Sequence, residues 1–336
     1  MTDAPPSLPS PADYFPLARG RYEVAAGLMR LGTDLGNGAA DGHIFQLDCD
    51  WVRYREAKLA SRAEARSKYV CRAALPLEME REAARMIVQR LVLEHPQYFS
   101  LTPPADKGRE LRCGLTGDTL VFNRGMELDA VRYGAAVDPP YSDALDALAC
   151  QLQEDFALDH VEDDGRDELV ALHICLPNHW APEEKLGRSF AAVHGPVPNF
   201  ERLGRQSAAL LRAVVERGPF VRFAWGLATD TRLNHHPLPP RDAPDTTLWR
   251  GRRFDPAVPE LFMRIERQAT WGLSSSRAFL FTIRTYFRDV RALDREQRCL
   301  LAEAVESMDV ATQRYKGLLE CQEDVLRFLN NEAGKR

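Results

Sequence analysis

The sequence lacks the features that mark several common classes of protein. Its 336 residues are 45% hydrophobic, yet no run of about 18 apolar residues occurs, so no membrane-spanning helix is expected. The N-terminal stretch MTDAPPSLPSPADYFP has no apolar core, which argues against a secretory signal peptide. No G-x-G-x-x-G motif follows an expected strand, so the chain carries no fingerprint of a dinucleotide-binding domain. There is no internal repeat.

Paired cysteines and lysine-rich stretches are also missing. The seven cysteines are widely spaced and none forms a C-x-x-C pair, which argues against a disulfide framework, a zinc site and a self-contained iron–sulfur cluster. A reducing cytoplasm is therefore the expected location. Only six of the 44 basic residues are lysine, the arginines are spread along the chain, and the net charge is −5. Composition thus gives no electrostatic case for nucleic-acid binding.

Helical patterns occupy both ends of the chain and one segment near its middle. Residues 51–70 are predicted to form a charged helix. In residues 79–95 apolar side chains recur at i, i+3, i+4 and i+7, and Pro96 ends the segment. A further helix is predicted over 142–156, and residues 294–331 are predicted to be helical with a capping box at their start.

Strand patterns dominate the second half. The expected strands are 118–123, 169–176, 220–227, 261–268 and 277–287. Separate strands with helices between them favour an α+β antiparallel sheet over regular βαβ units. Residues 1–17 are predicted to be a disordered or extended Pro-rich arm. The Pro-rich residues 235–259 are predicted to form a long loop of the kind used as a lid, binding loop or partner contact, with His235 and His236 solvated.

Charged residues interrupt three of these strands. Arg222, Arg264, Glu266 and Arg284 each alternate with apolar neighbours. Burying such groups is costly unless they are paired, so side chains that face inward would have to pair with one another or with a ligand in a polar site. The competing interpretation is a solvent-exposed face, which antiparallel sheets often have.

Histidines concentrate within and just after the second expected strand. His173, His179 and His194 fall within 22 residues, and His194 ends a short helix directly before a Gly-Pro break. A rigidly held imidazole beside an apolar run suits a metal or heme axial ligand. The alternative is a hydrogen-bonded packing residue. We expect His179 to lie in an exposed turn and His173 to be a hydrogen-bonded strand residue, so His194 is the leading candidate.

This segment resembles the signature of the alpha-subunit family of heme-dependent oxidative N-demethylases. Members of that family have a Pro-x-x-Trp turn, a Lys-Leu-Gly, and a His followed by Pro-Val-Pro. The corresponding residues here are Pro177–Trp180, Lys185–Gly187, and His194 with Pro196–Pro198. Further matches, in the expected order, are Tyr54–Lys58, Glu80–Ala84, Gln153–Asp155, Arg222 with Trp225, Arg264–Gln268 and Phe279–Tyr286. The resemblance covers roughly residues 45–290.

The resemblance implies a fold and a cofactor. The fold would be PAS-like, with a curved antiparallel sheet and flanking helices around a heme b. It would span residues 18–292, with a helical N-terminal part and a C-terminal helical segment at 293–336. His194 would ligate the iron, and the other cofactor-binding residues would be Lys185, Arg188, Trp180, Trp225 and Arg284. Arg222, Arg264 and Glu266 would be the catalytic residues. Surface charge and core packing are the competing explanations for Lys185 and Arg188 and for the two tryptophans, respectively.

The resemblance also implies an activity with partners. The chain would use oxygen to demethylate a small secondary alkylamine such as dimethylamine. Because the chain has no flavin, iron–sulfur or NADPH motif, electrons would come from reductase subunits that carry those groups, with folate accepting the one-carbon product. Two alternatives are a heme-binding sensor without turnover and a cofactor-free structural relative.

Two departures from the family pattern bear on these alternatives. After Gln268, members commonly have Leu-Arg-Arg-Leu-Pro, whereas this chain has Ala269–Ser274, which removes a basic pair and a proline and adds a tryptophan. The usual Asn before the second signature Trp is Ala224. If the missing groups hold heme propionates or substrate, this chain binds a different amine or has lost activity.

Overall fold

The computed structural model describes residues 7–102, 108–241, 243 and 253–333. The α-helices are α1 (Trp51–Tyr69), α2 (Leu77–Glu94), α3 (Ala144–Ala149), α4 (Phe190–His194), α5 (Glu201–Gly204), α6 (Ser207–Arg217), α7 (Arg295–Glu306), α8 (Val310–Lys316) and α9 (Gln322–Ala333). The short 3-10 helices are η1 (Gly38–Gly42), η2 (Pro182–Glu184), η4 (Ser274–Ser276) and η5 (Val290–Ala292). The strands are β1 (Met29–Arg30), β2 (Val70–Arg72), β3 (Phe99–Thr102), β4 (Arg109–Cys113), β5 (Thr119–Phe122), β6 (Leu128–Arg132), β7 (Asp155–Val161), β8 (Asp167–His173), β9 (Phe220–Ala228), β10 (Phe262–Leu273) and β11 (Ala278–Asp289).

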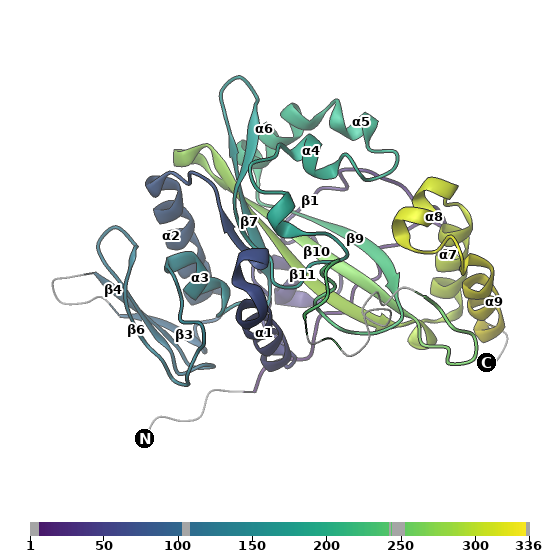
Figure 1. Cartoon of the computed structure of the whole chain (residues 1–336), viewed down its shortest axis with the longest axis horizontal. Coiled ribbons are helices and arrows are strands. Elements are labelled where there is room, and N and C mark those ends of the chain that lie inside the picture. Colours follow the sequence, from purple (N-terminus) through teal and green to yellow (C-terminus); the bar gives the residue numbers. More distant parts are fainter. Residues whose placement is uncertain (1–6, 103–107, 242, 244–252, 334–336) are drawn as a thin grey trace.

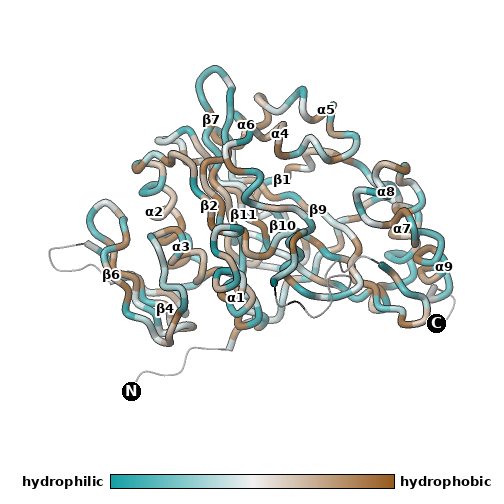
Figure 2. The backbone as a smooth tube through the Cα atoms, in the orientation of Figure 1, coloured by the Kyte–Doolittle hydropathy of each residue, from teal (hydrophilic) through white to brown (hydrophobic). Residues whose placement is uncertain are grey.

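The strands form two antiparallel sheets, which confirms the predicted α+β class. The larger sheet has the order β1-β9-β10-β11-β7-β8-β2, and the smaller has the order β3-β4-β5-β6. Figure 1 shows the larger sheet crossing the middle of the molecule, with α4, α5 and α6 above it, the smaller sheet at one end and α7–α9 at the other. Figure 2 shows hydrophobic residues concentrated in the central strands, while the turn between β7 and β8 is hydrophilic.

Side chains alternate between two faces of the large sheet. Glu266 of β10 is level with Ala224 of β9, whereas the next residue, Arg267, is level with Arg284 of β11. One face, which we call the α4 face, packs against η2, α4 and α6 through shared apolar clusters. It carries Asp155, Ala157, Asp159, Phe220, Arg222, Ala224, Arg264, Glu266, Gln268, Thr270, Phe281, Ile283 and Thr285. The predicted alternation of these strands is confirmed.

The opposite face of the large sheet is buried by two groups of elements. Apolar side chains of α2, α3 and the smaller sheet share one core with Ala269, Leu280 and Phe156. The C-terminal helices form a second core with Met263 and Ile265. Because both faces are covered, the charged strand residues cannot rely on bulk water and must be satisfied by neighbours.

An extended segment, residues 43–48, runs through this opposite core without regular secondary structure. Glu94 accepts hydrogen bonds from the backbone N–H groups of residues 44 and 45, Glu154 accepts one from that of Gln46 at 2.7 Å, and Gln153 accepts one from that of Asp48 at 2.8 Å. These side chains replace the ladder partners that a strand would have provided. Two residues of the family-like Gln-Glu-Asp motif therefore serve the backbone of a distant segment.

Glu154 makes stability depend on pH. Burial raises its pKa from an ordinary 4.5 to about 7, although Arg284 opposes that rise. Between these two values the folded state keeps a proton that the unfolded state has released, so the free energy of unfolding should fall as pH rises through this window. Glu154→Gln should remove about 1–3 kcal/mol of that fall, measured by denaturant unfolding from pH 4 to 8. The matched variant Glu56→Gln, at an exposed position, should keep the wild-type slope; an unchanged slope in Glu154→Gln would contradict the assignment.

Several predicted elements differ from the structure. The helix predicted over 142–156 ends at Ala149, and the residues from Asp155 onward form β7. Most of the smaller sheet is absent from the sequence prediction, which found only its strand β5. Within the predicted arm, residues 7–17 have no helix or strand but are packed, with Tyr14 and Leu17 buried; residues 1–6 lie outside the described residues. The capping box at Asp294 is confirmed.

Candidate functional site

His194 ends a short helix that is fixed to the sheet at its first turn. The Ser189 side chain accepts a hydrogen bond from the N–H of Ala192, and Asp167 of β8 accepts one from the N–H of Phe190. Both are N-cap interactions, which satisfy amides that a helix leaves unpaired. They hold α4, and with it His194, against the α4 face.

The imidazole of His194 is oriented by its own helix. Its Nδ1 lies 2.9 Å from the carbonyl oxygen of Phe190. A carbonyl only accepts, so Nδ1 carries the proton and Nε2 keeps a lone pair. Burial lowers the pKa of His194 to about 4, and the positive charges of Arg222 and Lys185 add to that effect. The ring is therefore neutral at physiological pH, the state that ligates a metal.

A cluster of packed apolar side chains, which we call the apolar slot, lies next to this histidine. Trp180, Leu186 and Val193, from the segment that leads to His194, pack against Ala157, Leu172 and Ile283 of the α4 face. Beside it, Phe190 packs with Phe220, Phe279 and Phe281. The side chains of this region are aliphatic and aromatic, the kinds that line the pocket of a planar organic cofactor.

A small polar group interrupts the α4 face near the slot. Glu266 is mostly buried, and each of its carboxylate oxygens accepts an amide hydrogen bond, from Asn178 at 3.1 Å and from Gln268 at 3.0 Å. Arg222 of β9 is also mostly buried, and its Nε has no hydrogen-bond partner within the described residues. Burial lowers the pKa of Arg222, while the negative charge of Glu266 opposes that shift. Arg222, Glu266 and His194 thus share one electrostatic environment.

Arg264, also predicted to be catalytic, is held by hydrogen bonds to two neighbouring loops. Its guanidinium donates to the carbonyl oxygens of Leu176 at 2.9 Å and Leu233 at 3.0 Å, and to Nδ1 of His235 at 3.0 Å. Its Nε lies 4.0 Å from Glu266. Arg264 therefore ties the turn after β8 and the loop after β9 to the sheet beside Glu266.

The structure does not bring every predicted site residue to His194. Arg284 and Trp225 lie on the opposite face, where Arg284 pairs with Asp48 at 2.6 Å and Trp225 packs edge-on against Tyr22. Their alternation with Arg222 and Ile283 along the same strands explains why they point away. The Arg188 side chain is exposed.

Lys185 stays close to the candidate ligand. Its Nζ lies 3.4 Å from the carbonyl oxygen of Val193, the residue before His194. Burial lowers the pKa of Lys185, and the nearby Arg188 charge adds to the shift. Of the two predicted propionate partners, Lys185 is the one held against α4.

Four other histidines that the sequence singled out are engaged elsewhere. His173 is buried in β8 and lies 3.0 Å from Asp146, as predicted for a hydrogen-bonded strand residue. His179 has a positive φ of 62° and stacks on His235. The expectation that His235 and His236 are solvated is wrong, because both are buried. They pair with Asp230 and Glu183, respectively, so the loop folds back onto the turn after β8.

Two buried groups have the composition of metal sites. Asp146, Cys150 and His173 form one, and Asp155, His173 and Cys175 form the other. Cations already occupy both, since Arg62 pairs with Asp146 at 2.8 Å and Lys58 lies 3.4 Å from Asp155. Burial raises the pKa of both thiols, so they hold their protons. We interpret these groups as core ion pairs.

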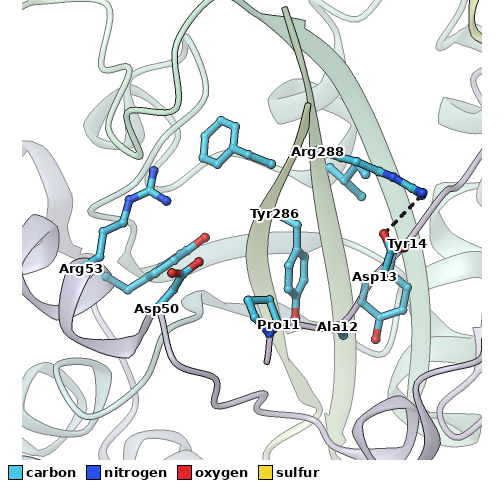
Figure 3. Close-up of a pocket in the computed structure, with 11 residues that line it drawn as sticks. Pro11, Ala12, Asp13, Tyr14, Asp50, Arg53, Tyr286 and Arg288 are labelled. Carbon is cyan, nitrogen blue, oxygen red and sulfur yellow. Dashed lines mark ion pairs between the residues drawn. The ribbon is translucent and has the colours of Figure 1, made fainter. Parts of the chain in front are cut away.

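Two cavities lie near the large sheet. A cleft of about 600 Å³ lies between residues 21–26, α5 and the start of α8; Tyr22, which lines it, also contacts Trp225 of β9. A smaller cavity of about 110 Å³ lies on the opposite face, lined by Tyr14, Tyr54 and Tyr286, with the Asp13–Arg288 ion pair at its edge (Figure 3). The larger cleft is the one beside the strand that carries Arg222.

The residues after Gln268, where the chain departs from the family pattern, mostly point away from His194. Ala269 and Trp271 lie on the opposite face, with Trp271 beneath the guanidinium of Arg90 at 4.9 Å. Thr270 lies on the α4 face with its hydroxyl buried. A Cβ on Gly272 would approach the Val215 carbonyl oxygen to 2.1 Å, so glycine here lets α6 pack closely on β10.

Together these features define an α+β protein with a neutral imidazole beside an apolar slot, an arrangement suited to an axially ligated heme. The chain belongs to the family described as haem-dependent oxidative N-demethylase, alpha subunit-like, whose model matches residues 37–326. The match extends the sequence resemblance into the C-terminal helices. None of the described helices is both long and apolar enough to cross a membrane.

Asn178 and Gln268 are site residues that the sequence did not single out. Asn178 lay inside the Pro-x-x-Trp turn and Gln268 at the end of a matched motif, but nothing in the spacing connected either to Glu266. The link between residues 178 and 266 spans 88 positions and depends on the fold. The one signal in the sequence was that Asn178, a side chain able to donate a hydrogen bond, directly follows the proline that begins the turn.

Proposed function

We propose that this chain binds heme b through His194 and uses oxygen to remove a methyl group from a small secondary alkylamine, with dimethylamine as the simplest candidate. The observation that carries the proposal is the neutral His194, whose Nδ1 is engaged and whose Nε2 is left for a ligand beside an apolar slot. Family membership supports the heme dependence and the reaction class. A PAS-type fold is part of the proposal, supported by the order β9-β10-β11-β7-β8 with helices between β8 and β9.

The described residues fit the heme on three counts. The imidazole offers one nitrogen in the required state, the slot is lined by apolar side chains, and the buried Arg222 has an orphaned Nε that an anionic group would satisfy. Arg222 and Lys185 are the cations placed to meet propionates, and the exposed Arg188 follows Lys185 by three residues. When bound, heme would supply oxygen binding and the oxidising power for the N-methyl group.

The chain's own residues would bind and orient the amine. A secondary alkylamine is protonated at neutral pH, so a carboxylate is its natural partner. Glu266 is mostly buried and held by two amides, which fixes the direction of its remaining lone pairs. Trp180 and the aliphatic slot would exclude water, which strengthens the ion pair between Glu266 and the ammonium group.

The reaction also needs an electron source. We propose reductase subunits that carry flavin, an iron–sulfur centre and an NADPH site, with folate as an acceptor of the one-carbon product. The alpha-subunit-like description of the family supports a multi-subunit system.

The cleft of about 600 Å³ beside β9 is the proposed route by which substrate reaches the α4 face.

Glu266→Gln tests the amine assignment. The change keeps the side-chain shape but removes the charge, so amine affinity should fall about 10- to 100-fold, the value of a charge-assisted hydrogen bond. The measurement is an amine titration of the heme Soret band. Glu260→Gln, at an exposed position just before β10, is the matched control. Equal amine affinity in wild type and Glu266→Gln would remove Glu266 from the binding site.

A further inference from the structure

Asp159 is a buried carboxylic acid on the α4 face that no step above uses. It lies in the middle of β7, level with Phe279 of β11 and Leu169 of β8. Its side chain is buried, with 5% of the residue exposed. Its Oδ1 has no hydrogen-bond partner in the part of the chain that the structure describes. A buried polar atom without a partner is rare and calls for a functional or structural reason.

The surroundings of Asp159 favour the neutral acid. Its neighbours along β7, β8 and β11 on this face are apolar, and so are the residues of α4 and α6 in the adjoining cluster: Ala157, Val161, Leu169, Phe190, Leu211, Val214 and Phe279. The charged groups that act on it are the carboxylates of Asp167 and Glu168. Burial raises the pKa of Asp159 well above its usual range, and these two negative charges raise it further. These surroundings therefore favour the protonated form of Asp159.

Two carboxyl groups at the start of β8 lie close enough to Asp159 to act on its charge. Glu168 is exposed, Asp167 is half-buried and Asp159 is buried. The pairing of β7 with β8 shifts register between Leu158 and Asp159, an irregularity that often redirects side chains near functional sites. Asp167 also accepts the hydrogen bond from Phe190 that fixes the start of α4. The same carboxyl group thus contacts the helix that carries His194.

The position relative to the candidate site follows from shared packing. Ala157, two residues before Asp159 on the same face, belongs to the cluster that includes Val193, the neighbour of His194. Phe279, level with Asp159, belongs to the cluster that includes Phe190. Asp159 therefore lies in the apolar floor that continues beneath α4.

We propose that Asp159 is a proton donor for oxygen reduction in this site, reloaded from solvent through Asp167 and Glu168. The inference rests on the proposed function. One N-methyl amine, one O₂, two electrons from the reductase and two protons give the demethylated amine, formaldehyde and one water. Asp159 supplies one of those two protons, and its carboxylate then regains a proton by way of Asp167 and Glu168.

The first test does not require heme. Infrared difference spectra of wild type minus Asp159→Asn at neutral pH should show the carbonyl stretch of one protonated carboxylic acid, because the contribution of Glu154, which also keeps part of its proton, is common to both proteins and cancels. Asp159→Asn should lose the band, and Asp164→Asn, at the exposed tip of the same hairpin, should keep it. Absence of a protonated-acid band from the wild type minus Asp159→Asn difference spectrum would overturn the proposal.

The second test uses the heme-loaded chain with dimethylamine and a reduced [2Fe–2S] ferredoxin as the electron source. Asp159→Asn should keep the Soret band and its response to amine but demethylate about 100-fold more slowly, the usual loss of a general acid. Its solvent deuterium isotope effect should also change, which a purely structural role would not cause. Unchanged demethylation in Asp159→Asn would overturn the proton-donor role while leaving the proposed function intact. Absence of a Soret band in the wild type would overturn the proposed function, and the proton donor with it, even if the infrared band is present.

Discussion

Replacing His194 with alanine is expected to abolish axial ligation of heme. His194 is the histidine that combines a neutral ring, an engaged Nδ1 and an adjoining apolar slot. Removal of the imidazole leaves the iron without its protein ligand, so the Soret band of protein reconstituted with hemin should disappear or shift strongly. Free imidazole, added to His194→Ala, should occupy the vacated space and restore much of the spectrum. Absorption spectra of the two proteins, with and without imidazole, measure this directly.

His179 provides the matched comparison for this experiment. It lies in the same family-like segment but stacks on the buried His235 at a ring separation of 4.9 Å. His179→Ala should bind heme with the wild-type spectrum. If His179→Ala loses the band and His194→Ala keeps it, the ligand assignment is wrong.

Arg284→Met is expected to cause the largest loss of stability. Arg284 is buried on the opposite face, pairs with Asp48 at 2.6 Å and lies 3.8 Å from the ring centre of Tyr54. The substitution preserves much of the packing but leaves the buried carboxylate of Asp48 without its cationic partner. The free energy of unfolding should therefore fall by about 3–5 kcal/mol, measured by denaturant unfolding. Arg288→Met, which breaks the partly exposed pair with Asp13, should cost about 1 kcal/mol or less.

This variant also separates a structural role from a cofactor role. The resemblance placed Arg284 among the cofactor-binding residues, whereas the strand register directs it away from the α4 face. Folded Arg284→Met, kept at a temperature well below its melting point, should retain the Soret band of the wild type. A fully folded Arg284→Met that fails to bind heme would support a cofactor-binding role for Arg284.

The parts of the fold that the sequence predicted are those set by local patterns. Alternation in β9, β10 and β11 requires only a period of two residues, and the capping box at Asp294 requires only residues three apart. The local pattern gave the wrong element at Gln153 and Glu154, which were predicted to lie in a helix that in fact ends at Ala149. Both side chains are polar, but each is buried and accepts a hydrogen bond from the backbone of the segment 43–48, about a hundred positions away. Tertiary contacts overrode the local preference.

In the candidate site too, local sequence patterns identified some residues, and others became apparent only from the fold. His194 and Glu266 were accessible from the sequence because family-like motifs surround them. Asn178 and Asp159 were not, because the first acts through a residue far along the chain and the second resembles any other strand residue until its burial is known. His235 was misjudged because a Pro-rich loop is usually solvated, whereas this loop delivers it to Arg264.

The most direct test of the central claim is the chemical product. The heme-loaded chain would be mixed with ¹³C-labelled dimethylamine in aerobic buffer, with electrons from NADPH, ferredoxin–NADP reductase and a [2Fe–2S] ferredoxin. We expect ¹³C-labelled formaldehyde to form in wild type and to be lost in His194→Ala. A wild type with a normal Soret band, reduced by the ferredoxin, that yields no labelled formaldehyde from dimethylamine or any other small N-methylamine would contradict the account.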